Sequence, residues 1–505
     1  MDGRTRVAGI ARALIPSAIS GEGDAADAHS PHPPSPAVAS HGARREGRGV
    51  RFAGRSPAWK PTDEDARLTD TAASPALRFP VRTHALGNGM RIVHHEDRSA
   101  PLVAVHLMYR VGSRDERPGR TGLAHLLEHL MFEGSLHAPK GQFDDLLERV
   151  GGTNNGSTWL DRTNYYETVP SNALELPLWL ERERMAFFLP VLDAEMLEVQ
   201  RGVVVNERRQ SYEARPYGMA DQRLHEMLFA GGHPYAWPTI GYMPDLEAIT
   251  LDDARGFYQT YYTPGNAVLV LAGDVGADDA FALAERYFGD LPPGPPLPPP
   301  ALPADPAPPA DVRHELMHDD VSFPRVYTAW AVPGYGTREW VALDVLAYLL
   351  SDGDSSRLQR ALVREGRIAQ DVDAYLYPTA LSGVFGVVST ARSAVAPQAL
   401  EVAVRRVLDE VASDGVSDDE LLGAVRRARR DQVGELATVE ERAEALAYAA
   451  TVLGEPEALE RVLDLYATVT AEEVRRAAEE WLGAHRSATL VVVPRPGTEE
   501  VADAA

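Results

Sequence analysis

Two histidines and one glutamate lie close together within residues 121–135, a stretch otherwise rich in leucine. His125, Glu128 and His129 form the pattern His-x-x-Glu-His. Residues four apart on a helix lie on one face, so the two histidines can bind one metal ion from successive turns. Glu128 can then reach a water molecule at that metal without ligating the metal itself. The pattern is the zincin motif His-Glu-x-x-His in reverse order, and it is typical of inverzincins.

The alternative interpretation is a pair of buried core histidines with a glutamate as ion-pair partner. Leu123, Leu126 and Leu130 repeat at helical spacing around the motif, so we expect the three polar side chains to be buried. Burying a charged glutamate between two histidines would be costly unless a cation were shared among them. The pattern therefore favours a metal site in which Glu128 is a general base.

Composition narrows the function classes further. The chain has 505 residues, of which 44% are hydrophobic, and 74 acidic residues against 50 basic ones give a formal charge of -24. This acidity argues against nucleic acid as a partner. The absence of cysteine excludes disulfides and thiolate metal ligands. No apolar run reaches the roughly 20 residues that a membrane span needs.

Changes in composition predict the domain organisation. We expect residues 1–78 to be a disordered extension, 79–291 a catalytic zinc-binding domain, 292–312 a proline-rich linker, 313–497 a second domain and 498–505 a tail. The mildly apolar segment 7–19 resembles a signal peptide but is interrupted by Arg12 and Pro16. We therefore expect a cytoplasmic location, with an exported or periplasmic one as the alternative.

Periodicity and turn residues predict the elements of the catalytic domain. Strands are expected on both sides of a Gly/Asn turn at residues 87–89, and again over 101–111, 154–159, 163–169 and 267–271. Helices are expected over the metal motif and over residues 142–150, 175–185, 193–215 and 251–262.

The sequence pattern of the second domain repeats that of the first. Thr250-Leu-Asp-Asp-Ala and Thr470-Ala-Glu-Glu-Val both open a helix that leads to an apolar strand, and the two are about 220 residues apart. At this offset the positions of the metal motif are occupied by Asp344, Ala347 and Tyr348. The copy keeps the apolar frame but lacks the metal motif, so the fold itself does not require these three residues.

A hydrolytic zinc site usually has three protein ligands, and here the third must be His, Asp or Glu. The segment 198–213 has the length of a helix and an apolar face through Val199, Val203 and Val204. Glu207 extends the site if that face packs on the metal helix. Spacing alone leaves three candidates for the third ligand, which are Glu198, Glu207 and Glu213.

Three blocks resemble the pitrilysin–insulinase family of zinc metallopeptidases, which includes the mitochondrial processing peptidase. They are Gly122-x-x-His-x-x-Glu-His-x-x-Phe-x-Gly, Gly151-Gly-x-x-Asn and Val203-Val-Val-Asn-Glu. The resemblance implies that Glu207, 78 residues after His129, is the third ligand of one Zn²⁺ per chain. The family often has another functional acid seven residues before that ligand. This chain has Gln200 there, and Glu198 is a possible substitute.

The same resemblance implies an α+β fold. Two homologous domains, each an antiparallel sheet flanked by helices, would form half of a peptidase chamber. The implied activity is that of a zinc-dependent endopeptidase, which hydrolyses peptides or small unfolded proteins with a metal-activated water. The alternative is a non-catalytic or metal-binding assembly subunit of a peptidase complex.

In this family an edge strand binds the substrate by adding it to the sheet. The matching residues here are Asn155, Gly156, Ser157 and Thr158. Main-chain hydrogen bonds would then bind peptides with little dependence on their sequence. For Asn155 a simple turn position is the alternative.

The resemblance also bears on the partner. In family members the half opposite the zinc supplies an Arg and a Tyr that face the substrate carbonyl. Here Val363 and Gln370 stand at those positions, and Arg364 is one residue away, which on a helix is a rotation of about 100°. We therefore expect a heterodimer with a homologous subunit that lacks the metal motif. The alternative is a homodimer that relies on Arg364 or Arg367.

Overall fold

The computed structural model describes residues 77–229, 232–299 and 313–496. The segment 7–19, nearly all of the predicted extension, the later part of the predicted linker and the whole predicted tail lie outside these ranges. The described part begins at Leu77, and the guanidinium of Arg78 is already paired with Asp464 at 3.0 Å.

Six strands of the first half form one sheet in the order β1-β2-β6-β3-β5-β4. Neighbouring strands are antiparallel except for the parallel pair β2 and β6. Gly89, with φ of 89°, lies in the predicted turn between the first two strands. The strands are β1 Val81–Ala85, β2 Arg91–Glu96, β3 Leu102–Tyr109, β4 Thr153–Thr158, β5 Thr163–Pro170 and β6 Ala267–Gly273.

Five strands of the second half form another sheet in the order β7-β11-β8-β10-β9. This order matches β2-β6-β3-β5-β4 strand by strand, and β7 and β11 form the matching parallel pair. The predicted fold of two similar α+β halves is confirmed. The single parallel pair, not predicted from the sequence, arises because the last strand of each half inserts beside the first strand of the repeat. These strands are β7 Arg313–Asp319, β8 Arg325–Val332, β9 Ala369–Tyr377, β10 Gly383–Ala391 and β11 Ser487–Pro494.

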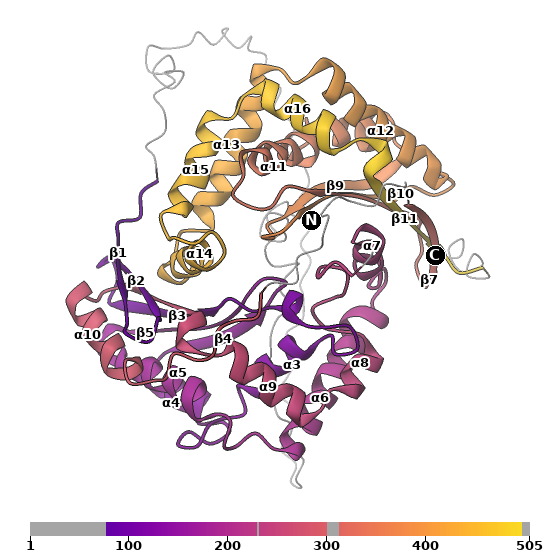
Figure 1. The fold of residues 1–505 in the computed structure, drawn as a ribbon. Helices are drawn as coiled ribbons and strands as arrows, with labels where there is room; N and C mark the ends of the chain where they lie inside the picture. Colours follow the sequence, from indigo (N-terminus) through magenta and orange to yellow (C-terminus); the bar gives the residue numbers. More distant parts are fainter. Residues whose placement is uncertain (1–76, 230–231, 300–312, 497–505) are drawn as a thin grey trace, which may run out of the picture. The chain divides into compact units, whose positions relative to one another are not determined.

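Helices cover one face of each sheet (Figure 1). Alternating residues of β3 and β6, such as Val105, Leu107 and Leu269, pack against the helices of the first half. The helices are α3 Leu123–Leu130, α4 Gln142–Arg149, α5 Glu175–Phe187, α6 Ala194–Arg208, α7 Ala220–Leu228, α8 Met243–Ala248, α9 Leu251–Tyr261 and α10 Ala277–Phe288 in the first half, and α11 Arg338–Ser351, α12 Pro397–Asp414, α13 Asp418–Gly434, α14 Val439–Val452, α15 Ala458–Thr468 and α16 Ala471–Trp481 in the second. The helix expected over 193–215 is α6 followed by a π-helical turn, Arg209–Glu213.

The opposite face of each sheet is covered by a helix from the other half. Met108 and Val270 of the first sheet share a core with Leu446 of α14. Ala331 and Leu490 of the second sheet share a core with residues of α7. In Figure 1, α14 lies beside β3, and α7 lies beside β11. The two predicted domains therefore complete each other's hydrophobic cores.

Within the described ranges, no helix combines the length and the apolar composition that crossing a membrane requires.

Candidate active site

Helix α3 carries the His-x-x-Glu-His pattern and is buried along its whole length. Gly122 caps its N-terminus with φ of 86°, a conformation that favours glycine. A Cβ at this position would lie 2.7 Å from the carbonyl oxygen of Ile240 and 2.7 Å from a methyl group of Leu246. The glycine that opens the motif therefore allows the metal helix to pack closely against α8 and the segment before it.

Glu116 anchors the start of α3, a role that the sequence did not reveal. Its carboxylate accepts backbone hydrogen bonds from Gly122 at 2.9 Å and Ala124 at 2.8 Å. Burial raises the pKa of Glu116 well above its usual value, although these two bonds oppose the shift. The carboxylate matches two of the N–H groups that a helix start leaves free. It lies six residues before the cap Gly122, outside the usual capping positions.

Helix α6 supplies the third side chain. Asp193 caps it by accepting a hydrogen bond from the Met196 amide at 2.9 Å. Its buried residues are Leu197, Gln200, Val204 and Arg208.

The prediction that three valines form a buried apolar face of α6 is wrong for two of them. Val204 is buried, but Val199 and Val203 are 49% and 39% exposed. Each precedes a buried residue by one position, a rotation of about 100° on the helix. The polar residue Gln200 occupies the buried face instead, because it has a hydrogen-bond partner there.

His125, His129 and Glu207 meet between α3 and α6. The Nε2 atoms of the two histidines are 3.3 Å apart. Oε2 of Glu207 is 3.5 Å from Nε2 of His129 and 3.8 Å from Nε2 of His125. Tetrahedral zinc with bonds of about 2.0–2.1 Å would place its ligand atoms about 3.3 Å apart. The three side chains therefore fit zinc, and in the described ranges they form the only such cluster of His, Asp and Glu.

The other two candidates for the third ligand lie elsewhere on α6 and the turn that follows it. Glu198 is exposed and pairs with Arg201 at 3.1 Å. Glu213 pairs with Arg208 at 3.4 Å. Of the three acids that the spacing left open, Glu207 is the one that meets the histidines.

The pKa values at the site suit metal ligation. Burial and the neighbouring His129 lower the pKa of His125 to about 4, against the charge of Glu207. Burial would raise the pKa of Glu207, but hydrogen bonding to His129 and the charges of both histidines lower it. A neutral imidazole and an ionised carboxylate are the forms that bind a metal.

Glu128 lies beside the three ligands and is only 2% exposed. Burial raises its pKa, although His129 and the hydroxyl of Thr158 oppose the shift. Oγ1 of Thr158 donates to Oε2 of Glu128 at 2.5 Å. This bond fixes one carboxylate oxygen and leaves Oε1 without a hydrogen bond to any other described residue. Thr158, predicted as a substrate-binding position, thus also orients the predicted general base.

Strand β4 is an edge strand of the first sheet. It contains all four predicted substrate-binding positions of the first half. Asn155 pairs with Tyr166 of β5 in the middle of the strand, so its interpretation as a turn residue is wrong. Arg162 follows the strand and donates to the carbonyl of Ser157 at 3.0 Å and to its hydroxyl at 2.7 Å. No described strand pairs with the outer edge of β4.

Arg364 is the predicted substrate-binding residue of the second half. It is exposed, lies in the π-helical segment Gln359–Glu365 and pairs with Asp354. Val363 packs on the second core. Nε2 of Gln370 donates to the carbonyl of Ala391 at 2.8 Å. The structure thus pairs Arg364 with an acidic neighbour in its own half.

The second half has different chemistry at the positions that match the metal motif. Asp344 accepts a hydrogen bond from the hydroxyl of Tyr466 at 2.6 Å. Burial raises the pKa of Asp344 to about 6, although this bond opposes the shift. Ala347 offers no polar side-chain atom, so these positions supply no metal-binding trio.

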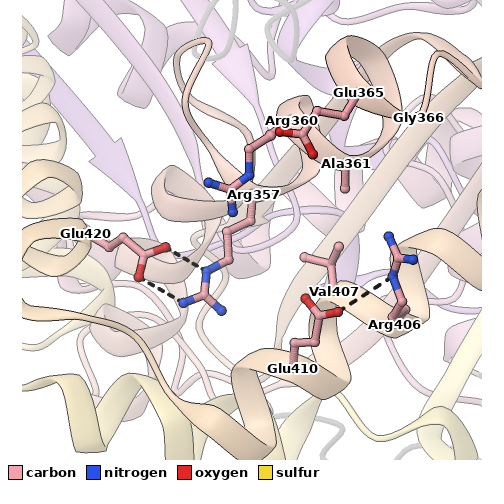
Figure 2. Close-up of a pocket in the computed structure, with 9 residues that line it drawn as sticks. All are labelled: Arg357, Arg360, Ala361, Glu365, Gly366, Arg406, Val407, Glu410 and Glu420. Atoms are coloured by element: carbon pink, nitrogen blue, oxygen red, sulfur yellow. Dashed lines mark hydrogen bonds and ion pairs between the residues drawn. The ribbon is translucent and has the colours of Figure 1, made fainter.

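A pocket of about 300 Å³ lies in the second half (Figure 2). Arg357 binds Glu420 at 2.8 Å, and Arg406 lies 3.6 Å from Glu410. The pocket contains no histidine, and these opposite charges are already matched. It is therefore a weaker candidate than the cluster on α3 and α6.

Comparisons with known proteins agree with the geometry. The family description "Insulinase (Peptidase family M16)" matches residues 91–238, and "Peptidase M16 inactive domain" matches residues 248–428. "Zinc protease PqqE" of Helicobacter pylori is 31% identical over 338 residues, which are 66% of this chain and 76% of that protein.

Two further matches extend the comparison. "Mitochondrial-processing peptidase subunit beta" of Caenorhabditis elegans is 26% identical over 267 residues, 53% of this chain and 55% of that protein. The crystal structure of a protease from Helicobacter pylori matches with a TM-score of 0.77 and 28% identity, over 82% of this chain and 100% of that chain. This chain therefore belongs to the pitrilysin–insulinase family of metallopeptidases, peptidase family M16.

Proposed function

We propose that this protein is a zinc-dependent endopeptidase that hydrolyses peptides or small unfolded proteins. The observation that carries this proposal is the triangle of His125, His129 and Glu207 ligand atoms, all within 4.8 Å of one another, with Glu128 buried beside it. A site that only stored metal would need no such acid.

When bound, zinc would supply Lewis acidity and lower the pKa of a coordinated water. Oε1 of Glu128 accepts the proton of the attacking water and later transfers it to the leaving amine. Thr158 holds Oε2, so that the carboxylate keeps one orientation during both transfers. The outer edge of β4 aligns the peptide through main-chain hydrogen bonds.

We also propose that the active form is a heterodimer with a homologous subunit that lacks the metal motif. Arg364 is engaged by Asp354, and neither Val363 nor Gln370 has a charged group that could stabilise a developing oxyanion. The partner would supply those donors. A homodimer that relies on Arg364 or Arg367 is the alternative.

Both proposals are tested by incubating an unstructured peptide with the purified chain, alone and with such a subunit, and detecting fragments by mass spectrometry. We expect slow cleavage by the chain alone and faster cleavage by the pair. A zinc chelator should abolish both activities, and added zinc should restore them.

The outcomes separate the proposals. Cleavage that survives the chelator would contradict the zinc mechanism. Full activity of the chain alone would contradict the heterodimer. Stable zinc binding without cleavage in either preparation would instead indicate a metal-binding assembly subunit.

A further inference from the structure

The hairpin that contains the predicted substrate-binding edge has an unusual turn. Leu160 and Asp161 connect its two strands, and the N–H of Trp159 donates to the carbonyl of Arg162 at 2.9 Å across them. Two-residue turns favour residues with positive φ, because these match the twist of the flanking strands. None of the four residues 159–162, all of which the structure describes, is glycine or has a positive φ. Contacts from outside the hairpin must therefore hold the shape of this turn.

The segment before the metal helix makes the first of these contacts. The backbone N–H of Ser113 donates to the carbonyl of Trp159 at 3.1 Å, and that of Arg114 donates to the carbonyl of Leu160 at 3.0 Å. Both bonds run from the loop between β3 and α3 to the backbone of the turn. The turn is therefore fixed on one side by the catalytic half itself.

The carboxylate of Asp161 makes the second contact, and it is completely buried. Its Oδ1 accepts from Nη1 of Arg114 at 2.5 Å and from the hydroxyl of Tyr235 at 2.6 Å. Its Oδ2 accepts from the backbone N–H of Ala380 at 2.8 Å. The Tyr235 hydroxyl in turn accepts from the backbone N–H of Leu381 at 2.9 Å. Both carboxylate oxygens thus have donors, which offset the cost of burying the charge.

Ala380 and Leu381 belong to the connection between β9 and β10 in the second half. These strands take the places of β4 and β5 in the repeat, so this connection is the counterpart of the turn that contains Asp161. Ala380 lies 219 residues after Asp161, which agrees with the offset of the repeat. The two homologous turns therefore meet, and only the turn of the first half supplies a carboxylate.

The turn directly follows a residue that the proposed reaction uses. Thr158 ends β4 and donates to Oε2 of Glu128 at 2.5 Å. On the other side of the turn, Thr163 begins β5 and donates to the carbonyl of Val111 at 3.0 Å. A shift of the turn would therefore displace both the hydroxyl that orients Glu128 and the strand edge that aligns the peptide.

We propose that Asp161 is a positioning residue through which the second half fixes the catalytic hairpin. Asp161 binds the second half, the turn sets the place of Thr158, and Thr158 orients Glu128. The half without a metal motif thereby contributes to the reaction in the other half. The effect on turnover rests on the proposed function, whereas the contact between the two turns can be tested without it.

The first test is turnover by Asp161→Asn. An amide has one acceptor oxygen in place of two, and the charge of Arg114 should keep that oxygen, so the bond to Ala380 is lost. The zinc ligands lie on α3 and α6, so the variant should hold as much zinc as wild type does. The kcat for an unstructured peptide, per bound zinc, should fall about tenfold or more, because a misplacement of about 1 Å can cost about 10²-fold.

Hydrogen–deuterium exchange tests the contact itself and needs no activity. In Asp161→Asn the backbone amides of segments 159–163 and 378–382 should exchange faster than in wild type. The amides of β1 and β2 should exchange at the wild-type rate. Tyr235→Phe is a second variant, which removes only the hydroxyl between Asp161 and Leu381. It should speed exchange in segment 378–382 and lower kcat less than Asp161→Asn does.

The matched control is Asp344→Asn. Asp344 is also a buried acid that accepts from a tyrosine hydroxyl at 2.6 Å, but it belongs to the core of the second half. This variant should keep the wild-type kcat per bound zinc and the wild-type exchange in both turns. Melting temperatures are measured for all variants, and the assays are run well below the lowest of them.

Wild-type kcat per bound zinc in Asp161→Asn, or unchanged exchange in both segments, would overturn the proposal. Equal losses in Asp161→Asn and Asp344→Asn would also overturn it, because they would show general destabilisation. If Asp161→Asn does not fold, the same two measurements on Tyr235→Phe decide. A zinc-loaded wild type without hydrolysis would contradict the proposed function, and exchange would still show whether Asp161 joins the two turns.

Discussion

A Glu128→Gln variant should lose peptide hydrolysis by about 10²-fold or more and keep its zinc. Glutamine has nearly the same shape as glutamate, and its carbonyl can still accept the hydrogen bond from Thr158. An amide cannot take a proton from water at neutral pH, so only the transfer step is removed. Turnover of an unstructured peptide and zinc content are measured on the same preparation.

The matched control is Glu226→Gln, which changes a partly buried acid paired with Arg223 at 2.8 Å, outside the metal cluster. It should hydrolyse peptide at close to the wild-type rate. Near wild-type turnover by zinc-loaded Glu128→Gln would show that another group takes the proton. Loss of zinc together with activity would show that Glu128 supports the metal rather than the transfer.

A His129→Ala variant should lose bound zinc, from about one ion per chain to a small fraction, and should lose hydrolysis with it. The change removes one of the three predicted ligand atoms, Nε2 of His129. The other two, Nε2 of His125 and Oε2 of Glu207, lie 3.3 Å and 3.5 Å from it. The remaining pair, His125 and Glu207, offers too few ligands for a structural or catalytic zinc site. Elemental analysis after dialysis measures the effect.

His84→Ala is the control, because His84 lies on the exposed strand β1. This variant should keep its zinc. Full retention of zinc by His129→Ala would contradict the ligand set. Loss of zinc from both variants would show that the effect does not depend on the site.

Local patterns predicted the parts of the site that depend on neighbours in sequence. The His-x-x-Glu-His motif and the apolar residues at helical spacing around it predicted the metal helix, and the Gly/Asn turn at residues 87–89 predicted the strands β1 and β2 on its two sides. The third ligand needed the family resemblance, because spacing did not distinguish Glu207 from Glu198 or Glu213.

Contacts between distant segments could not be predicted in this way. Glu133 stabilises Gln200 from 67 residues away, which explains why a polar residue occupies the buried face of α6 while Val199 and Val203 are exposed. The bond from Thr158 to Glu128 spans 30 residues. Helix α14 of the second half packs on the first sheet, and α7 of the first half packs on the second sheet. These contacts join distant segments, so the periodicity of the local sequence does not predict them.

Diffraction from zinc-loaded crystals tests most directly whether zinc is held by His125, His129 and Glu207 beside Glu128. Data are collected on both sides of the zinc absorption edge. We expect one anomalous peak about 2.0–2.2 Å from Nε2 of each histidine and from the Glu207 carboxylate. A peak at another cluster, or no peak between α3 and α6 in protein that contains zinc by elemental analysis, would contradict the proposed site.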